Sequence, residues 1–240
     1  MTVLGLTLAA PLQAWGSASR FTTRGTDDAP TKSGVIGLLA AARGLRRTDP
    51  LEDLLVLRFG VRLDQPGELL RDFQTARSLD GEHSMPLSYR FYRADARYLV
   101  GLEGDADLLT LLADALAHPA FPLYLGRRSC PPSEPLHPTL RDLSLERFLL
   151  DEPWRAAAWW RRRCPDGDAR VEFRIDASGG TSELDGYVQG RVVQRDEPIS
   201  FDPEFRQYGW RTVKQGLLPI AGVDAPSSGA LSHDPLAVVV

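Results

Sequence analysis

Two kinds of hydrophobic period alternate along the first 125 residues, and their order restricts the folds open to this chain. Leu4, Leu6 and Leu8 repeat at every second residue, which is the period of a half-buried strand, and Pro11 ends the run. Apolar residues at helical spacing follow, and the two patterns then recur. The sequence predicts strands that start at Thr2 and cover 56–63, 97–103 and 121–125, with helices at 30–45 and 105–117.

The predicted order is strand, helix, strand, strand, helix, strand. This order is typical of the ferredoxin-like α+β fold, which also underlies RNA-recognition domains. We assign it to residues 1–140, and the aromatic motif that stacks bases on the sheet of RNA-recognition domains is missing. Residues 141–215 are predicted to be a smaller, β-rich extension with a helix broken at Pro153. Residues 216–240, rich in Gly, Pro and Ala, are predicted to be a flexible tail.

Residues 64–96 interrupt the strand pattern with a segment rich in Asp, Gly, Arg and Ser. Its apolar residues are isolated, and the sequence predicts no core element and no regular structure there. Long segments of this kind between two strands are often functional or disordered. Arginines alternate with aromatic residues, as in many proteins that bind single-stranded nucleic acid. The sequence therefore predicts a functional insertion.

Two loops are candidate binding sites. The first carries Trp15 and arginines and leads into the helix start at Lys32 and Ser33, where free backbone N–H groups would suit a nucleic-acid backbone. The alternative is that Trp15 belongs to the core and that Thr31 or Ser33 only caps the helix. The second loop, YLGRRSCPPSEPLHP at 124–138, places two adjacent arginines after a glycine. A surface turn is the alternative there.

Charge and composition limit the partners. The net charge is −4 and the pI is near 5.6, so any RNA site must be a local patch rather than a basic surface. Two cysteines and four scattered histidines provide no disulfide framework and no metal cluster, and no cofactor is predicted. No apolar run approaches the roughly 18 residues of a membrane span, and no signal peptide is recognised, so a cytoplasmic location without membrane partners is expected.

Several motifs resemble those of one known family, the CasD subunits of the type I-E CRISPR surveillance complex Cascade, which belong to the RAMP superfamily. The resemblance covers residues 1 to about 215 and lapses in the tail. Asp27 and Asp28 in the first loop depart from the pattern. The matching stretches are Pro11–Gly16, Pro30–Gly34, Arg71–Thr75, Tyr124–Pro131 and Arg195–Pro198.

The resemblance implies a non-catalytic RNA-binding subunit in antiviral defence. It would cap the 5′ handle of the CRISPR RNA, contact the Cascade backbone subunit and the large PAM-reading subunit, and meet target DNA only indirectly. Residues 64–96 would form an insertion called the thumb. The implied handle-binding residues are Gln13, Trp15, Arg20, Arg24, Lys32, Ser33, Arg127, Arg128 and Ser129, and the implied thumb contacts are Arg77, Met85, Arg90 and Arg93.

Two enzymatic alternatives remain. Relatives in another CRISPR subtype are metal-independent endoribonucleases that process repeat RNA, which requires a general base and a general acid. Lys32, Tyr124, His83 and His137 are the candidates, and no spacing forces any two of them into a catalytic pair. A ferredoxin-like small-molecule enzyme would need a pocket with paired acid and base groups, and no motif defines one.

Overall fold

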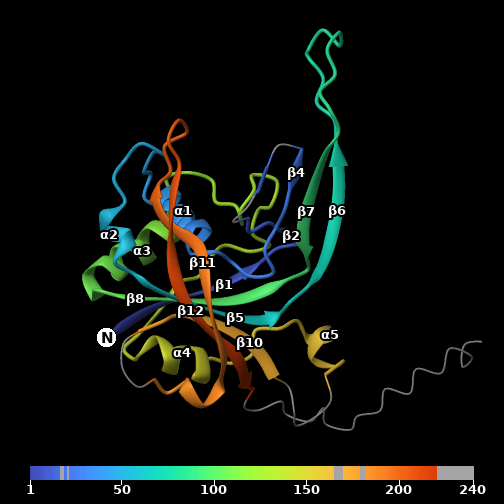
Figure 1. The fold of residues 1–240 in the computed structure, drawn as a ribbon. Helices are drawn as coiled ribbons and strands as arrows, with labels where there is room; N and C mark the ends of the chain where they lie inside the picture. Colours follow the sequence, from blue (N-terminus) through green and yellow to red (C-terminus); the bar gives the residue numbers. More distant parts are fainter. Residues whose placement is uncertain (17–18, 21, 165–169, 179–181, 221–240) are drawn as a thin grey trace, which may run out of the picture.

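The alternating leucines form a strand inside a large antiparallel sheet in the computed structural model, which describes residues 1–16, 19–20, 22–164, 170–178 and 182–220. Within these residues the large sheet has seven strands in the order β11-β12-β10-β5-β8-β1-β9 (Figure 1). Its strands are β1 (Thr2–Ala9), β5 (Arg58–Gln65), β8 (Arg97–Gly104), β9 (Thr139–Arg141), β10 (Arg170–Asp176), β11 (Val188–Ser200) and β12 (Gln207–Pro219).

Helices cover both faces of this sheet (Figure 1). The helix predicted after the first loop is α1, and Thr31 caps it by accepting a hydrogen bond from the Gly34 N–H. The helix predicted at 105–117 is α3, which Asp105 caps, and the helix predicted to break at Pro153 is divided into α4 and α5. The described helices are α1 (Lys32–Ala42), α2 (Glu52–Leu55), α3 (Ala106–Ala117), α4 (Leu145–Asp151), α5 (Ala158–Arg161) and the 3-10 turn η1 (Asp185–Tyr187).

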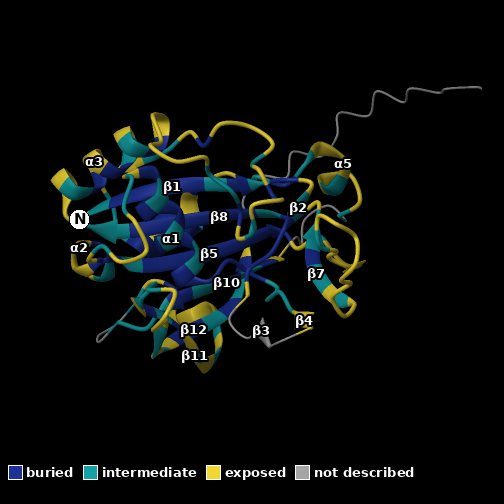
Figure 2. Ribbon diagram, turned by 90° about the horizontal axis from the view of Figure 1, so that it is seen from above, coloured by how far each residue is buried: buried dark blue, intermediate teal, exposed yellow. Residues whose placement is uncertain are grey.

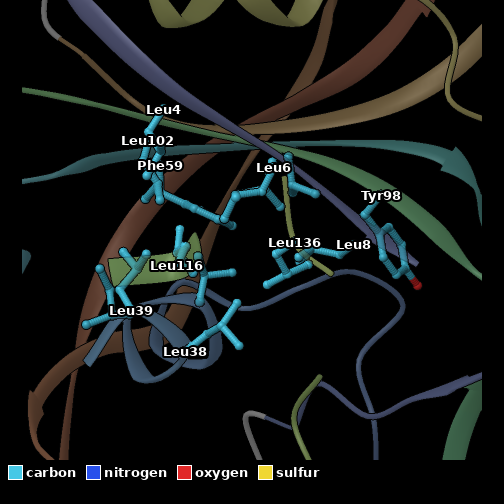
Figure 3. Close-up of a cluster of buried hydrophobic side chains, with 14 of the residues drawn as sticks. Leu4, Leu6, Leu8, Leu38, Leu39, Phe59, Tyr98, Leu102, Leu116 and Leu136 are labelled. Carbon is cyan, nitrogen blue, oxygen red and sulfur yellow. The ribbon is translucent and has the colours of Figure 1, made fainter. Parts of the chain in front are cut away.

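Each face of the sheet has its own hydrophobic core. Leu4, Leu6 and Leu8 point to the face covered by α1 and α3, where they meet leucines of both helices (Figure 3). Val3 and Leu99 point to the opposite face, which α4 covers. Figure 2 shows the central strands buried between these layers. The period-two pattern of the first strand therefore separates two cores rather than a core and solvent.

Three glycines on neighbouring strands of the sheet allow α4 to pack directly on the backbone. The strand register places Gly5 opposite Gly101 and Gly101 opposite Gly60. A Cβ atom on Gly5 would come within 2.5 Å of the Phe148 ring, and one on Gly101 within 2.5 Å of Leu145. Since α4 rests directly on backbone, larger residues at these positions would displace it.

Buried charge fixes the far end of α4. Arg62, at 2% exposure, pairs with Asp64 through N–O distances of 2.6 and 3.0 Å. The same guanidinium donates to the carbonyls of Leu149, Glu152 and Pro153, which the end of the helix would otherwise leave unsatisfied. Arg62 thus connects β5 to the chain that leads from α4 into α5.

A second sheet joins the N-terminal loop to the insertion. Its strands are β2 (Leu12–Gln13), β3 (Ser19–Arg20), β4 (Thr23–Arg24), β6 (Glu68–Gln74) and β7 (Ser88–Ala94). The strands β6 and β7 form a hairpin that rises from the body, and we call this hairpin with its tip the thumb (Figure 1). Along the edge that β6 does not occupy, β7 pairs antiparallel with β2 and parallel with β4.

The prediction that residues 64–96 lack regular structure is therefore wrong. Apolar residues on a two-stranded ribbon need not alternate, because both faces of most of the ribbon lie outside the core. Two further predictions of where elements begin and end also differ from the structure. Residues 121–125 form no strand, because Pro122 lacks an N–H and β9 occupies the edge of β1 instead. β12 continues through Pro219, so residues 216–219 belong to the sheet, and residues 221–240 lie outside the described residues.

Candidate nucleic-acid interface

A cleft of about 740 Å³ separates α1 from two other segments, the loop 121–131 and the turn between β11 and β12. We call it the arginine groove. Four arginines and four aromatic residues stand among its lining residues, and no carboxylate, lysine or histidine lies among them. The charged and aromatic lining residues are Arg46, Arg47, Arg128, Arg206, Phe121, Tyr124, Phe201 and Tyr208.

The end of α1 places two of these arginines. Gly44 adopts a left-handed backbone with φ of 79°, and Leu45 N–H bonds back to the Ala40 carbonyl at 2.9 Å. This glycine cap ends the helix, so Arg46 and Arg47 follow the turned chain into the groove.

The loop 124–131 supplies the opposite wall. The Leu125 N–H donates to the Cys130 carbonyl at 2.7 Å, and the Leu125 carbonyl accepts from the Ala14 N–H at 3.1 Å. The Cys130 N–H in turn donates to the Arg127 carbonyl at 2.8 Å. Gly126 has φ of 89°, and a Cβ atom there would lie 1.6 Å from the Ala14 carbonyl oxygen. Only glycine fits this close approach. The loop consequently leaves the side chains of Arg128 and Ser129 exposed.

Arg127 has a different role from its neighbour. Its Nη2 donates to the carbonyls of Arg24 and Gly25 at 2.8 and 3.1 Å, and its guanidinium lies 4.7 Å from the ring centroid of Tyr92. Tyr92 belongs to β7 and is 3% exposed. Arg127 therefore connects the loop, the N-terminal segment and the thumb, whereas Arg128 faces the groove.

The start of α1 is already occupied by protein groups. Asp196 accepts from the Lys32 N–H at 2.8 Å, and Arg211 binds both oxygens of Asp196 at 2.6 and 2.8 Å. Lys32 Nζ pairs with Asp176 at 3.2 Å and with Glu197 at 2.9 Å, and its side chain is only 6% exposed. We call these residues the buried charge network. In this structure the Lys32 N–H and ammonium group bind carboxylates of β10 and β11, so a phosphate at the predicted position would have to displace these partners.

Gln13 and Trp15 are also structural. Gln13 is fully buried, and its Nε2 donates to the Ala96 carbonyl at 2.8 Å. Trp15 is 1% exposed, donates from Nε1 to Gln13, and packs so closely on Gly34 that a Cβ atom there would lie 2.9 Å from the ring. A ring enclosed in this way cannot stack on a base. The alternative that Trp15 belongs to the core is confirmed.

The remaining residues of the first loop divide between groove and surface. Ser33 lines the groove at 8% exposure, and Arg24 is exposed on β4. Arg20 belongs to β3, and its side chain lies outside the described residues. Asp28, a departure from the family pattern, binds Arg174 through both oxygens at 2.8 and 2.6 Å. Burial alone would raise the pKa of Asp28, but the Arg174 hydrogen bonds outweigh it and lower that pKa.

The thumb residues lie apart from the groove lining. Arg77 and Met85 are exposed beside the tip, where Arg77 and Ser84 form an isolated bridge. Arg90 and Arg93 lie on β7 and are half-buried. The structure therefore gathers Ser33 and Arg128 in the groove and distributes the thumb candidates along the hairpin.

The sequence analysis gave no binding role to most of the aromatic wall or to three of the four groove arginines, Arg46, Arg47 and Arg206. Arg206 and Phe201 come from the turn between β11 and β12 and Tyr208 from the start of β12, at least 70 residues away from the loop that faces them. Phe121 was interpreted as part of a strand. No local pattern signals a wall that forms only when the long hairpin folds back over α1.

Comparison with known proteins assigns the chain to a family. The family model described as CRISPR-associated protein (Cas_Cas5) matches residues 3–214. The protein called CRISPR system Cascade subunit CasD of Escherichia coli (strain K12) is 36% identical over 237 residues, and the match covers 88% of this chain and 96% of that protein. The chain therefore belongs to the Cas5 family of CRISPR-associated proteins, and the resemblance to CasD is confirmed.

Solved structures agree with this assignment. A chain of a CRISPR RNA-guided surveillance complex superimposes with a TM-score of 0.71 at 32% identity, covering 91% of this chain and 90% of that chain. A crystal structure of a Cas protein gives a TM-score of 0.67 at 34% identity, with 90% and 95% covered. The mixed α+β fold with two largely antiparallel sheets is thus the fold of this family. In the part of the chain that is described, the helices are too short or too polar to cross a bilayer.

Proposed function

We propose that this chain is the CasD-type subunit of a type I-E Cascade complex and that its arginine groove binds the 5′ handle of the CRISPR RNA. The observation that carries the proposal is the lining of the groove, which combines four arginines with four aromatic residues and contains no carboxylate. Guanidinium groups bind phosphates in a fork geometry, and aromatic rings stack on splayed bases. The relatives named for Cascade and for RNA-guided surveillance support the same assignment.

The charge distribution agrees with a local site. The whole chain carries a net charge of −4, so a non-specific attraction to RNA is weak. Elsewhere in the body, many arginines pair with carboxylates, as Arg58 does with Glu103 and Glu146. The groove arginines face one another across a cleft, where a polyanion can neutralise all of them at once.

The fold supports membership in the RAMP superfamily. The order β9-β1-β8-β5, with α1 and α3 on one face, is the strand order of a ferredoxin-like unit, and we assign residues 1–140 to it with the thumb inserted at 64–96. Residues 141–215 extend the same sheet through β10, β12 and β11. The handle site would then lie where the extension folds back onto the ferredoxin-like unit.

The thumb suits contact with other subunits and the guide. Its outer positions carry exposed apolar and basic side chains that the body does not cover. We propose that the backbone subunit and the large PAM-reading subunit bind along it, and that target DNA is met only through these partners. The exposed apolar residues are Leu69, Leu70, Phe73, Leu79, Met85, Leu87 and Tyr89.

We favour a non-catalytic role over an endoribonuclease. Lys32 is held by two carboxylates, His83 lies near the thumb tip, and His137 lines a different cavity of about 350 Å³. Tyr124 alone among these candidates lines the groove. A ribonuclease that works without metal needs a base and an acid on opposite sides of one phosphate, and these four side chains come from separate sites.

The test is to incubate purified protein with its own repeat RNA, with and without EDTA. We expect RNA that is bound and remains whole, and weaker binding in Arg128→Ala. Arg147→Ala is the matched control, because Arg147 is an exposed arginine on α4 that pairs with Asp151. Specific cleavage at the base of the handle that is lost in Tyr124→Phe would overturn the non-catalytic role. Unchanged RNA affinity in Arg128→Ala and Arg206→Ala would remove the groove from the proposal.

A further inference from the structure

The helix α5 carries an aromatic and basic cluster that the handle site does not use. Trp159 and Trp160 lie edge to face, with ring centroids 5.6 Å apart, and Trp159 is 37% exposed. Arg161, Arg162 and Arg163 follow directly and are exposed. The Arg163 guanidinium lies 5.0 Å from the Trp159 ring centroid. We call these five residues the α5 platform.

The platform is attached firmly to the body at the foot of the thumb. Gln65, fully buried at the end of β5, accepts from the Ala157 N–H at 3.0 Å. Asp64 accepts from the Arg155 N–H at 2.6 Å, and its carbonyl accepts from the Trp154 indole at 2.8 Å. β5 passes from these residues into the thumb strand β6 (Figure 1). The two tryptophans are thus presented on a short helix whose first turn is held by buried groups.

The charges of these three arginines are not balanced by carboxylates of the described residues. Within the described part of the chain, no carboxylate forms an ion pair with Arg161, Arg162 or Arg163, whereas Arg155 nearby pairs with Glu152 at 2.7 Å. A helix of four residues has only a small dipole for cations to complement. Three adjacent like charges repel one another, and a polyanion would neutralise all three at once.

We propose that the α5 platform binds a segment of single-stranded nucleic acid outside the handle site. An exposed indole next to guanidinium groups offers a stacking surface for a base and contacts for the flanking phosphates. The platform shares no residue with the arginine groove, and Figures 1 and 2 both show α5 on the thumb side of the molecule, away from α1. The strand is either a guide RNA beyond its handle or a single strand of target DNA, which share this chemistry.

The experiment measures binding of the full chain to two labelled oligonucleotides without handle sequence, a uridine RNA and a thymidine DNA of equal length. The variants are Trp159→Leu and the triple change R161Q, R162Q and R163Q, with Arg147→Gln as the control. We expect about tenfold weaker binding for Trp159→Leu, because one stacked base is lost. For the triple variant we expect a larger loss and a salt slope lower by about 2, since each lost single-strand contact removes about 0.7.

The possible outcomes separate the two proposals. Handle RNA should bind both α5 variants as tightly as it binds the wild type. A groove variant such as Arg128→Ala should bind handle RNA more weakly and the two oligonucleotides as tightly as the wild type does. A preference for RNA or for DNA identifies the strand. Unchanged affinity and salt slope for both oligonucleotides overturn the platform but leave the groove untouched. Variants that bind oligonucleotides normally yet fail to join Cascade would assign the platform to a protein partner and also overturn the proposal.

Discussion

The buried charge network and the arginine groove use the same side chain in opposite ways, although both border α1. In the network, Arg211 is 8% exposed and binds Asp196 and Asp176, so every charge has a partner inside the protein. In the groove, Arg128 and Arg206 line a cleft that contains no carboxylate. The difference teaches that an arginine is available for a ligand only where no carboxylate of the protein already binds it.

Arginines of the thumb have a third kind of environment. Arg71 lies over the Tyr89 ring at 5.6 Å on an otherwise exposed ribbon. Tyr92 on the same strand is buried against Ala14 and Cys130. The hairpin is thus attached at its base and free at its tip, and mutations at the two ends should have different effects.

The largest effect on stability is expected for Asp196→Ala. This change removes one of the two carboxylates that bind Arg211, which keeps Asp176, and leaves the Lys32 N–H without its acceptor. Breaking a buried ion pair in this way typically costs about 3 to 5 kcal/mol. Urea unfolding measures the loss. Asp151→Ala, which breaks an exposed pair with Arg147, is the control and should cost less than about 1 kcal/mol. Equal costs for the two variants would contradict the distinction between buried and surface charge.

The next effect concerns binding rather than folding. Arg128→Ala should weaken handle RNA binding by about 1.5 to 3 kcal/mol, the typical contribution of a hydrogen bond to a charged group, with no change in urea midpoint. Arg127→Ala should lower both affinity and stability, because it also releases the Arg24 and Gly25 carbonyls. Anisotropy titrations and urea melts on both variants provide the comparison. Identical behaviour of the two would show that the neighbouring arginines have one role.

A smaller effect should appear in acid. Burial by itself would raise the pKa of Glu146, but hydrogen bonds from Arg58 dominate and hold it below the ordinary value of 4.5. The unfolded chain therefore binds a proton at higher pH than the folded chain does. The stability from this pair is fully present above pH 4.5 and is lost as the pH falls through the folded pKa. Glu146→Gln should show a shallower decline in unfolding free energy below pH 4.5, and an unchanged decline would contradict the assignment.

The smallest effect on stability is expected at the thumb tip. Replacing residues 75–87 with a short Gly-Ser turn keeps the β6–β7 pairing and removes exposed side chains, so the free energy of unfolding should change by less than about 0.5 kcal/mol. Incorporation into Cascade should nevertheless fall in a pull-down with the other subunits. Removal of the whole hairpin should destabilise the body, since Tyr92 and the β2 pairing are lost with it. A tip variant that assembles normally would place the subunit contacts nearer the base.

Local signals were sufficient where a short stretch decides the structure. Thr31 and Asp105 marked two helix starts through their capping side chains, and Pro153 marked the break between α4 and α5. Gly126 indicated an unusual backbone, which its contact with Ala14 explains. These features depend on neighbours within a few residues, and propensity and capping describe such neighbours well.

Only the tertiary structure decided which charges remain available for a ligand. The sequence by itself determined the two hydrophobic periods, the helix caps and the motifs of the family. It could not show that Lys32 would meet Asp176 and Glu197, more than 140 residues away, or that Arg206 would face Arg128 across a cleft. Whether an arginine folds against a carboxylate or faces solvent depends on long-range strand pairing, and such pairing leaves no periodic trace around either residue.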